Sequence, residues 1–264
     1  MSLKRILGVF YRYYYILLKG PQQLSDLFYW PFIDILLWGL TSVWIRSKTP
    51  DLIEQERLPL FLLTGLIFWQ VTWRGSIDIS INLLQEFWQR NLVNLFSSPL
   101  KITEWAAGVI LLCLCKLCIT VAFGIGMVYL LYSLNILTVG WMFIPFAISL
   151  LLFGWTIGFL AASAIIYWGH QVEAVAFMIG FVFAPFSAVF YPVSVLPVWT
   201  QMISWCLPTT YIFEGMRSLL ATGSFPISDL WISLGLNLVY LTLSFSLFQR
   251  IFQKSLAKGL ARLE

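Results

Sequence analysis

Long apolar runs constrain this chain more than any other feature of its sequence. Of its 264 residues, 60% are hydrophobic and 11% are charged, whereas a soluble domain is about half apolar and a quarter charged. A helix crosses the roughly 30 Å hydrocarbon core with about 20 apolar residues and satisfies its backbone polar groups internally. The runs are continuous rather than alternating, which disfavours a β-barrel. We therefore predict an all-α, polytopic membrane protein.

Six apolar segments are predicted to span the membrane within one transmembrane domain, residues 1–264. They are residues 28–45, 58–73 (with the helix continuing towards residue 84), 102–132, 141–168, 172–191 and 230–248. Ahead of them, residues 1–20 place Arg5, Arg12 and Lys19 on one side of a helix and apolar side chains on the other. Such an amphipathic helix is expected to lie in the membrane interface, its basic side facing anionic lipid headgroups.

The basic residues orient the chain, because Lys and Arg accumulate in the cytoplasmic loops of membrane proteins. If both termini are cytoplasmic, most of the 16 Lys and Arg residues lie inside. The inside set is Lys4, Arg5, Arg12, Lys19, Arg74, Arg90, Lys101, Arg250, Lys254, Lys258 and Arg262, and the outside set is Arg46, Lys48, Arg57 and Arg217. Topology thus accounts for the net charge of +4, which indicates no nucleic-acid partner.

A short polar stretch, residues 86–101, separates the second and third apolar segments. We predict a cytoplasmic helix over residues 85–96 that ends before Pro99, because a proline ring clashes with the preceding turn and has no N–H. Its apolar face has i, i+3, i+4 spacing and consists of Leu92, Leu95 and Phe96. Two interpretations stay open: an ordinary interfacial loop, or a helix on which a soluble partner docks.

Two charged residues lie deep in the apolar segments, Asp34 in the first and Lys116 in the third. A charge in hydrocarbon is costly and usually faces the bundle interior or a water-filled path. Asp34 and Lys116 are therefore either candidates for a substrate path or a pair that locks two helices together. His170 and Glu173 lie in a second cytoplasmic link, between the fourth and fifth segments.

Residues 191–220 are apolar but interrupted by prolines, so one straight spanning helix is not expected. Irregular backbone at membrane depth has to be shielded by protein or water. We predict two short re-entrant or interfacial helices on the external side. The residues that characterise this segment are Pro192, Leu196, Pro197, Trp199, Pro208, Glu214 and Arg217.

Gly154, Gly158 and Ala162 follow one another at four-residue spacing in the fourth apolar segment. Small residues at this spacing allow two membrane helices to approach closely. The same spacing also arises by chance in glycine-rich membrane helices.

Catalytic and metal-binding patterns are weak. Cys113 and Cys118 point apart on the predicted helix, so they suit packing better than a metal site, and His170 is the only histidine. No nucleophile–base–acid set is visible. The phosphate-binding pattern G-x-x-x-x-G-K-[ST] is absent, so the chain is not expected to hydrolyse ATP by itself.

Three stretches together resemble the permeases of ABC-2 type transporters, and the resemblance extends over essentially the whole chain. They are the basic amphipathic helix, the stretch RNLVNLFSSPLKITEWAAG at residues 90–108, and YPVSVLPVWTQMISWCLPTTYIFEGMR at residues 191–217. By this resemblance the chain is a permease without enzymatic activity, two copies of which form a path for a drug, lipid or lipid-linked glycan in the plasma (inner) membrane of a prokaryote.

The resemblance also implies two separate ATP-binding cassette subunits, which would bind ATP and Mg²⁺, while this chain carries no cofactor. The ATPase-coupling residues would be Arg90, Asn91, Leu92, Leu95, Phe96, Ser98 and Pro99. The remaining partners would be a second copy of the chain and membrane lipids.

Two other classes are weighed against this resemblance. An ion-coupled secondary transporter would usually show inverted repeats and several carboxylates near the membrane midplane. An integral membrane enzyme that modifies lipids would need a cluster of catalytic polar residues at one membrane face. Asp34 is the single clear midplane carboxylate in the sequence, and neither a repeat nor such a cluster is visible.

Overall fold

The computed structural model describes residues 2–48, 58–224 and 226–257, and within these ranges the chain is helical without any strand. Arg57, Lys258 and Arg262, assigned above from charge, lie outside these ranges. The helices are α1 Leu3–Lys19, α2 Pro21–Lys48, α4 Leu58–Trp88, α5 Leu92–Ser97, α6 Ile102–Tyr132, α7 Phe143–Trp168, α8 Glu173–Phe183, α9 Val198–Trp205, α10 Pro208–Thr222 and α11 Ile227–Ala257. Short 3-10 helices are η1 Ile136–Met142, η2 Gly169–Val172, η3 Pro185–Ser187 and η4 Val193–Val195.

Four helical segments of the described chain are long and apolar enough to cross a membrane. They are Gln23–Lys48, Ile102–Tyr132, Ile136–Trp168 and Ile227–Ala257. The central helix α4 has 31 residues, which is ample length for a crossing, but it carries many polar side chains. The all-helical membrane fold is thus confirmed, and the count of six spans stays a prediction.

The predicted fifth segment, residues 172–191, is not one continuous helix. α8 has 11 residues, about 17 Å at 1.5 Å per residue, which is well short of the bilayer core. It ends just before Pro185, which begins η3. The prediction of one continuous helix did not take this proline into account. Ala188 then adopts a left-handed conformation with φ of 55°, and this directs the chain away from the helix axis.

The helix predicted over residues 85–96 is divided in two. α4 continues to Trp88, three residues form a turn, and α5 begins at Leu92. Arg90 has a φ of 47°, in the left-handed region that breaks a right-handed helix. The backbone N–H of Asn91 donates to the carbonyl of Glu86 across this turn (2.9 Å).

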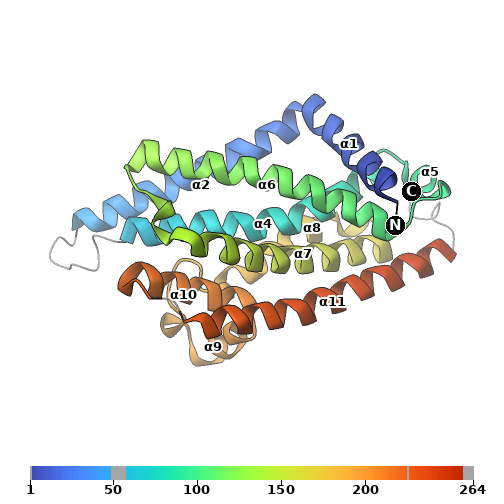
Figure 1. The fold of residues 1–264 in the computed structure, drawn as a ribbon. Helices are drawn as coiled ribbons and strands as arrows, with labels where there is room; N and C mark the ends of the chain where they lie inside the picture. Colours follow the sequence, from blue (N-terminus) through green and yellow to red (C-terminus); the bar gives the residue numbers. More distant parts are fainter. Residues whose placement is uncertain (1, 49–57, 225, 258–264) are drawn as a thin grey trace.

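α4 is the centre of the bundle, packed against α2, α6 and α7 (Figure 1). The close helix approach predicted at Gly154 and Gly158 is confirmed, and the neighbour is α4. A β-carbon on Gly154 would lie 2.5 Å from the Thr72 carbonyl oxygen and 2.9 Å from the Gly75 Cα. A β-carbon on Gly158 would lie 2.8 Å from the Ser76 carbonyl oxygen. The backbones of α4 and α7 are therefore in direct contact.

Gly154→Ala is expected to destabilise the folded protein, because the added methyl group meets backbone atoms that cannot rotate away. Overpacking of this kind costs about 1–3 kcal/mol. The measurement is the midpoint of thermal unfolding of the detergent-purified protein. Gly126→Ala is the matched control on α6, since nothing lies within 4 Å of its would-be β-carbon. Equal midpoints for the two variants would contradict the contact.

The two ends of the bundle carry different short elements. The start of α1, α5 and the end of α11 lie at one end, and α9 and α10 lie at the other (Figure 1). The two short helices predicted within residues 191–220 are therefore present. Pro197 forms the N-cap of α9 and Pro208 the first residue of α10, positions at which the missing proline N–H costs no helix hydrogen bond.

Candidate functional site

A ladder of polar side chains follows α4 at four-residue intervals through the protein interior. The five are at most 7% exposed and consist of Gln70, Arg74, Asp78, Asn82 and Glu86. Four residues exceed one helical turn by about 40°, so the ladder winds around α4 and turns from one neighbouring helix to the next along its length. It contacts α2 at Gln70, α6 at Asp78 and α1 at Glu86.

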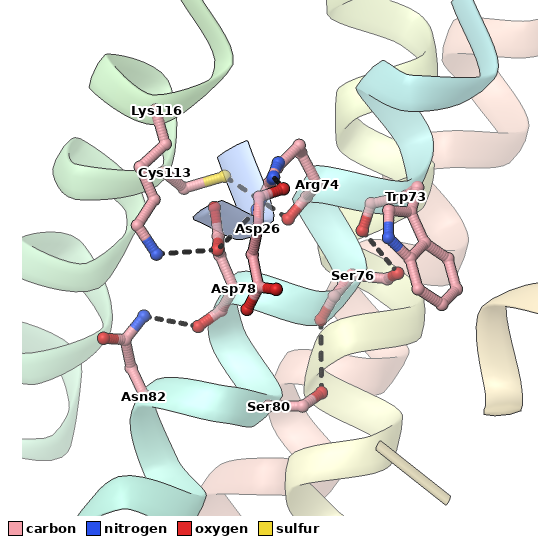
Figure 2. Close-up of polar contacts among 9 residues, drawn as sticks. All are labelled: Asp26, Trp73, Arg74, Ser76, Asp78, Ser80, Asn82, Cys113 and Lys116. Carbon is pink, nitrogen blue, oxygen red and sulfur yellow. Dashed lines mark hydrogen bonds and ion pairs between the residues drawn. The ribbon is translucent and has the colours of Figure 1, made fainter. Parts of the chain in front are cut away.

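The middle of the ladder holds a buried cluster of three charges (Figure 2). Lys116 on α6 donates to Asp78 Oδ1 at 3.0 Å, and Arg74 Nη1 lies 3.9 Å from the same oxygen. The exposed fraction is 7% for Arg74, 2% for Asp78 and 7% for Lys116. Two cations around one carboxylate give the cluster an excess positive charge inside the bundle.

Neighbouring groups hold this cluster in place without completing all its hydrogen bonds. Arg74 Nη2 donates to the carbonyl of Asp26 at the start of α2, and Asn82 donates to the carbonyl of Asp78 (2.6 Å). Cys113 donates its S–H to the carbonyl of Arg74 at 3.8 Å. Asp78 Oδ2 and Arg74 Nε are buried without a partner.

Asp34 does not pair with Lys116, so the alternative in which these two residues lock two helices together is wrong. Its carboxylate instead accepts a hydrogen bond from Gln70 Nε2 at 3.0 Å, and Lys116 is occupied by Asp78. Asp34 is half-buried on α2, and thus remains more accessible than any member of the charged cluster. Arg74, assigned above to the cytoplasmic side, lies instead inside the bundle.

Glu86 ends the ladder and joins α4 to α1 and to the start of α5. Its carboxylate accepts hydrogen bonds from Arg12 Nη2 (2.9 Å), the Tyr13 hydroxyl (2.8 Å) and Asn91 Nδ2 (2.8 Å). Burial raises the pKa of Tyr13 well above its usual range, and the negative charge of Glu86 raises it further. Tyr13 therefore stays a neutral donor to this carboxylate.

Glu104 forms a second anchor for α1, at the first turn of α6. Its carboxylate accepts from the backbone N–H of Ser2 (2.7 Å) and Lys101 (3.1 Å), and from Arg5 Nη1 (3.3 Å). The adjacent Trp105 donates its indole N–H to the Tyr13 hydroxyl at 2.9 Å. Arg5 and Arg12 thus turn partly towards acidic side chains of the protein, rather than only towards lipid headgroups as predicted.

The predicted apolar docking face of residues 86–101 is turned inward. Leu92 is fully buried, and Leu95 and Phe96 pack against the same hydrophobic core. The Phe96 ring lies 4.6 Å, centroid to centroid, from the ring of Phe252 on α11. The surface of this stretch is formed instead by Trp88, Gln89, Arg90, Asn94, Ser97, Ser98 and Pro99, which are exposed.

The second link, which contains His170 and Glu173 and is predicted to be cytoplasmic, lies beside this stretch. The indole N–H of Trp88 donates to Glu173 Oε2 at 3.0 Å, which joins the end of α4 to the start of α8. Trp88 keeps 52% of its surface exposed. His170 lies in η2 of this link.

The opposite end of the bundle is organised by Glu214 and Arg217 of α10. Glu214 accepts from the backbone N–H of Val193 (2.6 Å) and forms an ion pair with Arg217 (3.1 Å). Arg217 also donates to the carbonyl of Ala188 (2.7 Å), the residue with left-handed backbone. These two side chains therefore hold the irregular segment between α8 and α9, on which Pro192, Leu196 and Pro197 lie. Trp199, on α9, is 65% exposed.

Sequence reasoning missed Asp78 and the roles of Arg74 and Glu86. The signal was available, because polar residues recur at every fourth position from residue 70 to residue 86. Side chains three or four residues apart lie near one another on a helix surface. A run of such residues in a helix otherwise rich in Leu, Ile and Phe indicates a face turned towards protein.

Apolar helices of spanning length around a buried charged helix define a multi-pass helical membrane protein. A search of curated proteins found no match. The family model of the ABC-2 type transporter matches residues 22–221, well over half of the chain. This chain belongs to the ABC-2 type transporter family, and its membrane domain is a permease component rather than a catalytic domain.

Proposed function

We propose that this chain is the permease subunit of an ATP-driven exporter for a hydrophobic or amphipathic substrate: a drug, a lipid or a lipid-linked glycan. Two copies would form the path in the plasma (inner) membrane of a prokaryote, each crossing six times with cytoplasmic termini. Two separate ATP-binding cassette subunits would bind ATP and Mg²⁺ and supply the energy.

The observation that carries this proposal is the network around Glu86. The buried carboxylate of Glu86, on α4, binds Arg12 and Tyr13 of α1 and Asn91 in the turn before α5. A displacement of the exposed stretch by an ATPase subunit would therefore act on α1 and on the central helix together. The polar ladder extends from this point to Asp34, the residue we propose for the substrate path.

The charged cluster supports an ATP-driven rather than an ion-coupled mechanism. An ion-coupled transporter needs carboxylates that can bind and release ions near the midplane. Asp78 is buried in the bundle, but Lys116 lies 3.0 Å from it and Arg74 3.9 Å from it. A carboxylate held by two cations is suited to structure rather than to ion exchange.

Trp88→Ala is expected to weaken binding of the ATPase subunit, because an exposed aromatic side chain at this end is the best anchor for a protein partner. Loss of such an interface residue costs on the order of 2 kcal/mol, about 30-fold in Kd. The experiment is co-expression with the ATP-binding cassette subunits of the same organism, followed by affinity purification and measurement of ATPase activity.

Trp141→Ala is the matched control, since Trp141 is 74% exposed on η1, on the proposed external side. It should leave the ATPase subunit bound. Equal loss in both variants would point to a general folding defect, and undiminished binding in Trp88→Ala would exclude this surface as the docking site. Failure of wild-type protein to retain any ATPase subunit would overturn the proposed function itself.

A further inference from the structure

A pocket of about 300 Å³ opens between α1 and the stretch that follows α5. It is lined by Arg5, Gly8, Val9, Arg12, Leu95, Ser98, Pro99 and Leu100. The two arginines lie two turns apart on one side of α1, and Gly8 lies between them. A β-carbon on Gly8 would meet nothing within 4 Å, so the glycine leaves the space between the arginines open.

The pocket retains hydrogen-bonding capacity for an anion. Arg12 uses Nη2 to bind Glu86, whereas its Nε is buried without a partner. Arg5 uses Nη1 for both the carbonyl of Pro99 (2.6 Å) and Glu104 (3.3 Å). A guanidinium has five N–H donors, so these contacts do not exhaust either arginine. α1 carries Lys4, Arg5, Arg12 and Lys19 and no acidic residue. Glu86 and Glu104 pair with Arg12 and Arg5, so the four cations of α1 outnumber these two acidic partners.

The surface of α1 beside the pocket is suited to a membrane interface. Its buried side consists of Val9, Tyr13 and Leu17. Leu3, Tyr11 and Leu18 are 69%, 52% and 49% exposed, and on a helix they form a sector that borders the basic one. An exposed apolar sector next to a basic sector is typical of a helix that lies among lipid headgroups.

We propose that this pocket binds the phosphate group of an anionic phospholipid. Arg5 and Arg12 would hold the phosphate oxygens, and the acyl chains would extend along the exposed apolar sector of α1. Because Ser98 and Pro99 belong to the stretch proposed to contact the ATPase, the bound lipid would link the membrane to that stretch. The site depends neither on the direction of transport nor on the substrate.

An acidic side chain of a protein partner is the other anion that could enter this pocket. The lipid is favoured because exposed apolar side chains of α1 border the arginines, and these need an apolar environment that an acidic protein loop does not provide. Free phosphate would satisfy the arginines, but would leave that sector unpaired.

Gly8→Leu tests the proposal, because it fills the pocket and leaves every charge in place. Protein in detergent is mixed with equal amounts of phosphatidylglycerol and phosphatidylcholine, and the retained lipids are counted by native mass spectrometry. Wild-type protein and Gly8→Ala should retain phosphatidylglycerol about tenfold better than phosphatidylcholine, the contribution expected of basic residues at a lipid surface. Gly8→Leu should lose this preference, whereas Gly126→Leu, the same change in an open position on α6, should keep it.

Three results would overturn the proposal. One is the absence of any preference in the wild-type protein, and another is an unchanged preference in Gly8→Leu. The third is displacement of the lipid by millimolar inorganic phosphate, which would make the site one for free phosphate. If Gly8→Leu keeps the lipid preference but no longer co-purifies with the ATPase subunit, the pocket is a site for the protein partner. Lipid retention is measured on the purified permease without an ATPase subunit. Its outcome is therefore independent of the test of the proposed function, which measures retention of the ATPase subunit.

Discussion

Asp78→Asn is expected to be among the most destabilising single substitutions in this chain. It leaves the ammonium group of Lys116 and the guanidinium of Arg74 buried, each 7% exposed, without a negative partner. Removal of one member of a buried ion pair costs about 3–5 kcal/mol, because the remaining charge has lost its solvation and its counter-charge. The expected result is a large loss of monodisperse protein after heating, measured by size-exclusion chromatography in detergent.

A second substitution separates the charge effect from other causes. Asp78→Asn combined with Lys116→Met removes the unpaired ammonium group and should recover most of the lost stability, since neutral replacements of buried ion pairs are tolerated. Asp34→Asn is the matched control: Asp34 is half-buried and accepts one hydrogen bond from Gln70, so a loss of about 1 kcal/mol is expected. If the double variant were no more stable than Asp78→Asn alone, the cluster would not be an ion pair in the folded protein.

Glu86→Ala should release α1 from the bundle while the spanning helices stay folded. Arg12, Tyr13 and Asn91 lose their shared hydrogen-bond acceptor, the fully buried Glu86 carboxylate. Hydrogen bonds to charged groups contribute about 1.5–3 kcal/mol each. The Arg12 side chain is 33% exposed, so water replaces part of its contribution. We expect a local loss of about 3–4 kcal/mol, which is a few hundredfold in the exchange rate of α1 amide hydrogens.

Hydrogen exchange followed by mass spectrometry measures this effect directly on residues 3–19. Glu173→Ala is the control, because Glu173 is an exposed carboxylate with one hydrogen-bond donor, Trp88, at the same end of the molecule. It should leave exchange in α1 unchanged. Slow exchange in Glu86→Ala would mean that Glu104 alone holds α1, and that the proposed path from the exposed stretch to α1 does not depend on Glu86.

The elements that follow from local sequence were predictable. α6 begins at Ile102 and ends at Tyr132 as predicted. It is a single apolar run that follows Pro99 and its polar neighbours and ends shortly before Asn135. α1 was predictable from its amphipathic pattern, and the two short helices α9 and α10 from the prolines at their starts.

Partners across helices were not predictable from composition. The sequence suggests a pair of Asp34 and Lys116, because they are the two most prominent charges in apolar segments. Lys116 instead binds Asp78, which lies on a third helix. The apolar spacing of Leu92, Leu95 and Phe96 correctly indicates a buried face. It does not tell whether that face is covered by a partner or by the protein's own α11, and Phe252 provides the cover.

If α4 forms the predicted second span, the polar ladder also affects how it enters the membrane during synthesis. Arg74, Asp78 and Glu86 lie in one helix, and a charged residue near the centre of a lone helix costs about 2.5–3.5 kcal/mol to insert. Lys116, the counter-charge of Asp78, is made later, on α6. The lowest-cost order of insertion for this predicted span would therefore delay the release of α4 into lipid until α6 has been made, so that Asp78 and Lys116 enter the lipid together.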